Sequence, residues 1–238
     1  MDLKEEEILG ELVENHWYYR SKAAALLRLA APLHARRILD VGAGSGFFSR
    51  SLLANTGAQE AMCVDPCYQE ERDELITGKP LWFRRDCDTT DADLLLMMDV
   101  LEHVEDDFGL LNSYVNKIPS GAYVMVTVPA FRFLWSGHDV FLGHYRRYSL
   151  EEVVGMLEST GLKLEQQCYY FGLVFPLGAT MRLLGNLRRK QEDAPRSDLK
   201  QHNALTNGLL SLMCRMELPW FQYNRLAGLS VFCLARKR

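Results

Sequence analysis

The segment Arg37–Phe48, with the sequence RILDVGAGSGFF, constrains the fold more than any other part of the chain. Ile38–Val41 is apolar apart from one aspartate, which is typical of a short buried strand. Glycines follow at alternate positions, Gly42, Gly44 and Gly46, and a helical pattern begins directly after them. Glycine is needed where the backbone takes positive φ or where a ligand approaches it closely. Because free N–H groups at a helix N-terminus would face this turn, the segment predicts a binding site for a nucleoside-bearing cofactor.

The spacing of these glycines separates two classes of cofactor. The dinucleotide fingerprint is G-x-G-x-x-G, and the helix that follows it binds a pyrophosphate. Here the pattern is G-x-G-x-G, with Asp40 two residues before the first glycine. A carboxylate at the strand end suits a cationic cofactor better than a pyrophosphate. The segment resembles the cofactor loop of class I S-adenosylmethionine (SAM) methyltransferases, whose cofactor carries an ammonium and a sulfonium but no phosphate.

Three further landmarks follow in the order that this resemblance implies. Asp65 ends the segment Glu60–Asp65, 19 residues after the last glycine, where an acidic residue accepts hydrogen bonds from ribose hydroxyls. After the third expected strand, Leu81–Arg85, Asp86 is the candidate for the adenine amino group, with Asp88 as the alternative. The segment Asp93–Val104 ends in DVLEHV and resembles the fourth motif of many small-molecule methyltransferases. The resemblance implies a SAM site formed by Asp40, Gly42, Ala43, Gly44, Gly46, Phe47, Asp65, Pro66, Asp86, Cys87, Met98 and Asp99.

The order of apolar and helical segments from residue 37 to residue 129 predicts a parallel sheet with crossover helices. Ala122–Val128 is the fifth expected strand, and the resemblance implies that Lys163–Tyr170 and Leu229–Ala235 pair antiparallel at one edge. The predicted fold is α/β: a doubly wound, seven-stranded, mostly parallel, Rossmann-like sheet of the class I methyltransferase type, with a helical insertion before the last strand. We expect residues 1–238 to form a single domain.

Two segments outside the sheet are expected to cover the site. Residues 1–34 are predicted to form an N-terminal helical cap, in which Trp17 and Tyr18 either contact the substrate or dock the helix on the core. Residues 171–228 are predicted to form a helical insertion or lid, because hairpin connections usually have about 2–5 residues. Within it, 171–190 is apolar and then basic, and its apolar run is shorter than the roughly 20 residues that span a bilayer. The insertion is expected to build an apolar acceptor pocket or to contact a membrane surface peripherally.

The acceptor side is expected after the fourth and fifth strands, because ligands of open α/β sheets bind beyond the carboxyl ends of the strands. Residues 129–149 are dense in histidine, arginine and aromatic side chains and show little strand or helix periodicity, so we expect them to form a loop. They resemble a block in bacterial methyltransferases of the type 11/12 group, many of which have no assigned acceptor. A hydroxyl acceptor must lose its proton, and histidine titrates near neutral pH. The candidate catalytic residues are His144, then His103 and His138, and the candidate substrate contacts are Trp17, Tyr18, Glu102, Trp135, Arg147 and Tyr148.

A divalent cation is an alternative at the exit of the fourth strand. Some related enzymes with an E-x-x-E-H ending bind a cation through it. Here Asp99 stands in place of the first glutamate, and His144 would complete the set. The expectation from the sequence is a site without a metal.

The composition limits the functional classes. The net charge of −4 argues against an enzyme that gathers nucleic acid on a basic face, and the chain lacks the [DN]-P-P-[YF] motif used to methylate amino groups of bases. Six scattered cysteines without a C-x-x-C pair, and an acidic first ten residues, predict a cytoplasmic protein with reduced thiols and no secretory signal. Membrane association through the insertion is compatible with that location.

The predicted function is SAM-dependent methyl transfer, of the EC 2.1.1 class, to a small or lipid-like acceptor, with oxygen as the favoured atom and no nucleic-acid partner. Two alternatives stay open: a non-catalytic scaffold with the SAM fold, and a nucleotide-dependent oxidoreductase, which the glycine spacing disfavours. The sequence specifies neither the acceptor nor the oligomeric state.

Overall fold

A single eight-stranded sheet organises the computed structural model, which describes residues 15–188 and 204–238. The strand order is β3-β4-β2-β1-β5-β6-β8-β7. Neighbours are parallel from β4 through β2, β1 and β5 to β6, whereas β3, β8 and β7 pair antiparallel. The strands are β1 (Arg37–Val41), β2 (Glu60–Val64), β3 (Arg72–Ile76), β4 (Lys79–Arg84), β5 (Leu94–Met98), β6 (Tyr123–Pro129), β7 (Leu162–Tyr170) and β8 (Ser230–Lys237).

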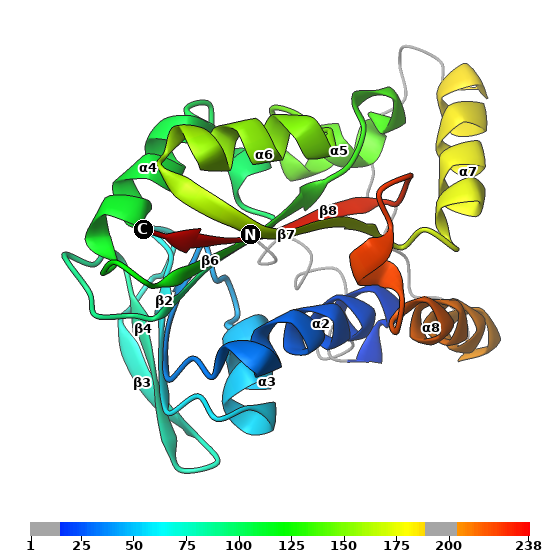
Figure 1. Ribbon diagram of the computed structural model, residues 1–238. Helices are drawn as coiled ribbons and strands as arrows, with labels where there is room; N and C mark the ends of the chain where they lie inside the picture. Colours follow the sequence, from blue (N-terminus) through cyan, green and yellow to red (C-terminus); the bar gives the residue numbers. More distant parts are fainter. Residues whose placement is uncertain (1–14, 189–203) are drawn as a thin grey trace.

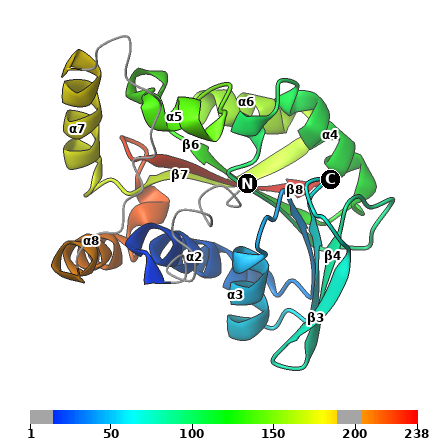
Figure 2. The ribbon, with the colours of Figure 1, turned by 180° about the vertical axis from the view of Figure 1, so that it is seen from behind.

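Helices cover both faces of this sheet (Figures 1 and 2). One face carries α2 (Trp17–Ala30), α3 (Phe47–Asn55) and α8 (Ala204–Glu217). The other carries α4 (Asp107–Lys117), α5 (Gly137–Leu142) and α6 (Leu150–Ser159). Helix α7 (Phe175–Arg188) stands at the edge near β7 and β8 (Figure 1). Short 3-10 turns are η2 (Ala31–Leu33), η3 (Leu101–His103), η4 (Arg132–Leu134) and η5 (Phe221–Tyr223).

Two apolar clusters, one on each face, hold these layers together. Leu26 of α2 and Leu52 of α3 belong to one cluster with Phe232 of β8. Leu111 of α4 and Val153 of α6 belong to the other. All five residues of β5 are buried, as expected for a central parallel strand that is covered on both faces. The chain reverses its winding between β1 and β5, and in doubly wound sheets that switch point is where ligands bind.

The predicted α/β fold is confirmed, with one correction to the strand count. The sheet has eight strands rather than seven, because β3 adds an antiparallel edge strand beside β4. Thr77 and Gly78 connect the two strands, and both take positive φ (+52° and +81°), as two-residue hairpin turns require. The sequence prediction also treated residues 129–149 as lacking regular structure. This is wrong for α5, which begins with a capping box formed by Ser136 and Asp139.

The two predicted covering segments contain helices in the parts that the structure describes. Helix α2 begins after His16, which caps it, and ends before the turn that contains Pro32. The rest of the predicted cap, residues 1–14, lies outside the described residues. The insertion forms α7, α8 and η5, and its polar middle, residues 189–203, also lies outside them. In the part of the chain that the structure describes, none of the helices has the length and apolar character needed to cross a membrane.

Candidate active site

The glycine turn after β1 is built as the sequence predicts. The φ angle is +65° at Gly42, +54° at Gly44 and +77° at Gly46. A Cβ at Gly42 would lie only 2.8 Å from Cγ2 of Val100, and one at Gly46 would lie 3.0 Å from the ring of Phe83. Larger residues are therefore excluded by both the backbone conformation and the space. The close approach of Gly42 to Val100 also places the turn against the exit of β5.

Two buried carboxylates flank this turn at the ends of the first two parallel strands. Asp40 accepts a hydrogen bond from the Ser49 hydroxyl on α3 (2.7 Å). Asp65 accepts from the backbone N–H groups of Gly44 (3.3 Å) and Cys67 (2.9 Å). The role of Asp65 in accepting hydrogen bonds from the ribose hydroxyls stays a prediction. Two buried carboxylates beside a turn that admits only glycine fit a cationic nucleoside such as SAM.

The other predicted cofactor residues lie at the same carboxyl edge of the sheet. They are Ala43, Phe47, Pro66 and Met98. Asp86 follows β4, with an exposed carboxylate 3.3 Å from the Lys117 ammonium. A hydrogen bond from the Cys87 N–H, together with Lys117, lowers the pKa of Asp86. Burial raises the pKa of the neighbouring Cys87 thiol. The role of Asp86 and Cys87 in binding adenine stays a prediction.

Asp99, the last predicted cofactor residue, forms an ion pair that the sequence reasoning missed. Its partner is the fully buried Lys22 of α2, whose ammonium also donates to the Tyr18 hydroxyl (3.0 Å). The other carboxylate oxygen of Asp99 accepts from the Thr127 hydroxyl (3.1 Å). Burial acts to lower the pKa of Lys22, but Asp99 and Tyr18 together outweigh it and the pKa is raised. Helix α2 is thereby fastened directly to the exit of β5.

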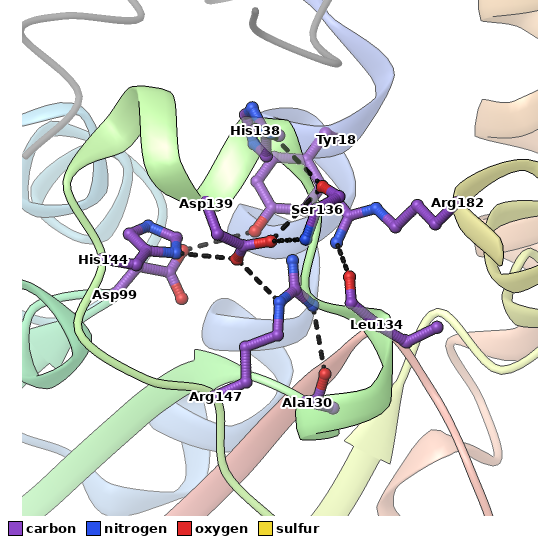
Figure 3. A network of polar contacts seen from close by, with 10 residues as sticks. All are labelled: Tyr18, Asp99, Ala130, Leu134, Ser136, His138, Asp139, His144, Arg147 and Arg182. Carbon is purple, nitrogen blue, oxygen red and sulfur yellow. Dashed lines mark hydrogen bonds and ion pairs between the residues drawn. The ribbon is translucent and has the colours of Figure 1, made fainter. Parts of the chain in front are cut away.

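A polar network centred on Asp139 organises the connector between β6 and α6 (Figure 3). One oxygen of this buried carboxylate lies 3.0 Å from Nδ1 of His144 and accepts from Nε of Arg147 (2.7 Å). The other accepts from the backbone N–H of Ser136 (2.8 Å). Arg147 also donates to the carbonyl oxygen of Ala130 (3.1 Å). The hydrogen bond from His144 and the charge of Arg147 lower the pKa of Asp139 despite its burial.

His138 differs from the other two candidate histidines in its electrostatic surroundings. Burial, and then the charge of Arg182, lower its pKa to about 3. Arg182 reaches this region from α7 and donates to the carbonyl oxygen of Leu134 (3.4 Å; Figure 3). At neutral pH the His138 ring is therefore uncharged and a weak base, which makes it the poorest of the three catalytic candidates.

Glu102, His103 and His144 form a compact cluster beside the β5 exit. One potential ligand atom of each residue lies within 4.8 Å of the others, and the two imidazole rings are 4.6 Å apart. Glu102 is almost fully buried, and within the described chain its Oε2 has no hydrogen-bond partner. Burial, and then the charge of Asp99, raise the pKa of Glu102. The Tyr145 N–H donates to the carbonyl oxygen of Glu102 (2.7 Å), which fastens the connector to η3.

The remaining candidate substrate contacts are used for packing or for other hydrogen bonds. Trp17 is buried in the core and meets Phe171 edge-on at 5.7 Å. Tyr148 is buried and donates its hydroxyl to Asp107 (2.7 Å). Trp135 is half-buried at the end of η4. The Tyr18 hydroxyl donates to Asp99 (3.3 Å), and Arg147 donates to Asp139. Glu102 belongs to the cluster with His103 and His144. Contact of Tyr18, Glu102 and Arg147 with a substrate stays a prediction.

Two sequence signals would have identified the missed residues. Lys22 follows Tyr18 by four positions, so the two side chains lie on the same side of the helix. The apolar residues of this helix face the core. Asp139 follows Ser136 by three positions, which is the spacing of a capping box. Both charged side chains, Lys22 on α2 and Asp139 on α5, lie on the buried face of their helix.

The donor set of the cluster is compatible with a divalent cation. Two imidazoles and a carboxylate are ligands that Zn²⁺ and related metals accept, and Asp139 orients His144 as ligand-supporting carboxylates do. The predicted fourth member, Asp99, is instead engaged by Lys22, Tyr18 and Thr127.

Comparisons with known proteins identify the family. Residues 15–167 match the family described as a methyltransferase domain. The chain belongs to this methyltransferase family. No curated protein matches the sequence significantly. The methyltransferase nature predicted from the glycine turn and the DVLEHV motif is thereby confirmed, whereas the acceptor and the methylated atom are not given by this match.

Solved structures share the fold at low sequence identity. A candidate methyltransferase from Haloferax volcanii, solved with the methyltransferase activator Trm112, has a TM-score of 0.56 at 14% identity, covering 95% of this chain and 92% of its own. A SAM-dependent methyltransferase from Archaeoglobus fulgidus gives 0.50 at 16%, covering 92% and 94%. The [4+2]-cyclase SpnF gives 0.56 at 12%, covering 92% and 81%. The methyltransferase family comes from the sequence match, and these structures confirm the class I SAM-dependent methyltransferase fold.

Proposed function

We propose that this methyltransferase transfers the methyl group of SAM to a hydroxyl oxygen of a small or lipid-like acceptor, as one domain spanning residues 1–238. The observation that carries the proposal is the contact of His144 with Asp139 (3.0 Å), within a cluster that also holds His103 and Glu102. The approach of Val100 to Gly42 supports placing this cluster next to the cofactor turn.

Each half of the site has a defined task in this proposal. When bound, SAM would supply an electrophilic methyl carbon for in-line attack by the acceptor oxygen, with the thioether sulfur of S-adenosylhomocysteine as the leaving group. Asp40 and Asp65 bind the cationic and ribose parts of the cofactor. His144, with its ring proton on Nδ1 facing Asp139, takes the acceptor proton on Nε2. The Asp139 carboxylate then stabilises the imidazolium, as the orienting carboxylate does in a catalytic triad.

The test compares turnover with cofactor binding. Tritiated SAM is incubated with fractionated cell extract as the source of acceptor, and the labelled product is identified by mass spectrometry. His144→Ala is expected to lower methyl transfer by about 10²–10⁴-fold, with the SAM affinity from calorimetry almost unchanged. His34→Asn, at an exposed position before β1, is the control and leaves both quantities unchanged. Unchanged turnover in His144→Ala would remove the histidine from the mechanism.

A bound divalent cation is a second candidate for activating the acceptor, favoured by Oε2 of Glu102, which has no hydrogen-bond partner among residues 15–188 and 204–238. Glu102, His103 and His144 would hold the cation, which would act as a Lewis acid on the acceptor oxygen. In that case His144 is a ligand rather than a base. Activity that survives exhaustive EDTA treatment decides against the cation. Loss of activity that is restored by one added metal decides for it.

Composition also bears on the protein's cellular location and partners. We propose a cytoplasmic enzyme without a nucleic-acid partner, in line with its acidic balance and its six free cysteines. A scaffold protein without catalytic activity is the alternative to an enzyme. The fold by itself does not specify methyl transfer, because the [4+2]-cyclase SpnF shares it. Calorimetry without any heat of SAM binding would favour the scaffold. Stabilisation by NAD rather than S-adenosylhomocysteine in a thermal shift would revive the oxidoreductase.

A further inference from the structure

Helix α8 exposes an uninterrupted apolar stripe on its outer side. Leu205, Leu209, Leu212 and Met216 follow one another at spacings of four, three and four residues, so they share one face. Each is more than half exposed, at 85%, 59%, 53% and 56% respectively. The inner face of the same helix is separate and packs on the core through residues such as Cys214. The outer stripe is therefore not needed to attach the helix to the sheet.

Helix α7 carries a similar stripe at the same end of the molecule. Leu177, Met181 and Leu184 are spaced by four and three residues and are about half exposed or more. Trp220, three residues after the end of α8, is 70% exposed. In Figures 1 and 2 both helices lie at the end opposite the β3–β4 hairpin. Large exposed apolar surfaces of this kind mark sites of interaction with a partner or a membrane.

The charge around α7 and α8 indicates what kind of partner binds their exposed apolar faces. Residues 171–228 contain eight basic and four acidic residues, a net charge of +4, although the whole chain carries −4. The described acid of this segment, Glu217, is buried and accepts from the N–H groups of Gly172 (2.8 Å) and Leu173 (3.2 Å). Arg215 and Arg225 are exposed. An apolar face on a helix that also carries the exposed Arg215, within a segment of positive net charge, suits an anionic lipid surface, whereas a second copy would present the same positive charge and repel it.

We propose that the α7–α8 face, formed by Leu177, Met181, Leu184, Leu205, Leu209, Leu212, Met216 and Trp220, docks peripherally on an anionic membrane surface. The proposal goes beyond the methyl-transfer chemistry and stands without it. Docking would also bring the lipid close to Arg182, which extends from α7 to the carbonyl oxygen of Leu134 beside the Asp139 network (Figure 3). The same helix would then contact both the membrane and the acceptor side of the site.

Sedimentation of the full chain with vesicles tests this docking. Vesicles of phosphatidylcholine are compared with vesicles that also contain phosphatidylglycerol, at low and high salt. We expect about tenfold more bound protein on the anionic vesicles at low salt, with the difference shrinking as salt screens the arginines. The variant Leu209→Glu/Leu212→Glu is expected to lose this binding, because it places two carboxylates in the centre of the apolar stripe.

The control uses an exposed leucine at the opposite end of the molecule. Leu75→Glu changes a residue of β3 that is 72% exposed and is expected to bind vesicles as the unchanged chain does. Circular dichroism verifies the fold of each variant, and Leu205→Glu, at 85% exposure, serves if the double variant does not fold. The proposal is overturned if anionic vesicles retain no protein or if the control loses binding equally. Gel filtration showing a dimer that the double variant dissociates would assign the face to a second copy instead.

Discussion

His138 allows a quantitative test of the electrostatics around the connector. Its ring is almost fully buried, and burial together with the charge of Arg182 lowers its pKa to about 3, against 6.5 for an exposed histidine. The unfolded chain therefore binds a proton at this position at a higher pH than the folded chain does. Stability contributed by the neutral ring is complete above pH 6.5 and is lost as the pH falls from 6.5 toward 3.

The size of the effect follows from proton linkage. Each pH unit below 6.5 lowers the free energy of unfolding by about 1.4 kcal/mol, until the folded-state pKa is reached. Between pH 7 and pH 5 the loss due to His138 is therefore about 2 kcal/mol. A folded-state pKa one unit higher would change this figure by less than about 0.1 kcal/mol, because pH 5 would still lie above it.

The assay is urea unfolding at pH 7 and pH 5 for the unchanged chain and for His138→Gln. The buried carboxyl groups of Glu102 and Glu217 have raised pKa values and shift stability in the opposite direction, so only the difference between the two proteins isolates His138. We expect the variant to lose about 2 kcal/mol less than the unchanged chain on going from pH 7 to pH 5.

A substitution at a buried site changes the free energy of unfolding at every pH. The quantity compared is therefore its change between pH 7 and pH 5, not its value at pH 7. His138→Phe provides a second ring that does not titrate and is expected to show the same reduced pH dependence as His138→Gln. If both variants retain the pH dependence of the unchanged chain, the ring is not held neutral by burial, and His138 returns as a candidate base.

Substitutions at Gly42 and Lys22 test the cofactor half of the site, with Gly78 as a control position. Gly42→Ala and Gly78→Ala both place a Cβ at positive φ and are each expected to destabilise the fold by about 1–2 kcal/mol in urea unfolding. Only Gly42→Ala also meets Val100, so only this variant is expected to weaken SAM binding in calorimetry; equal SAM affinities would contradict the steric argument. Lys22→Met leaves the Asp99 carboxylate without its ammonium partner and is expected to cost about 3–5 kcal/mol, which Asp99→Asn in the same chain restores in part.

The cofactor half of the site could be predicted because its signals are local in the sequence. A strand, a turn and a helix within Arg37–Asn55 bring Asp40 and the glycines together without help from distant residues. Asp65 follows the next parallel strand, and the register of β1 against β2 places it at the same edge. The periodic pattern that predicts the sheet therefore also positions these carboxylates.

The missed features have physical reasons. Strand β3 has the sequence RDELI, in which three of five residues are charged, because an edge strand exposes much of its surface. The Thr77-Gly78 turn was the available signal for its hairpin. Lys22 was overlooked because lysine in a helix is usually solvated, and its burial depends on Asp99, 77 residues away in the chain.

The acceptor half combines groups whose protonation states depend on each other, and this explains why sequence alone left three histidines open. Asp139 stays ionised because His144 and Arg147 contact it, while the charge of Asp99 and burial favour the protonated form of Glu102. Because burial, and then the charge of Asp99, disfavour a negative charge on Glu102, Asp139 is the better carboxylate for stabilising a protonated imidazole. Substituting Arg147 would therefore affect proton transfer through Asp139, whether or not the arginine also contacts the acceptor.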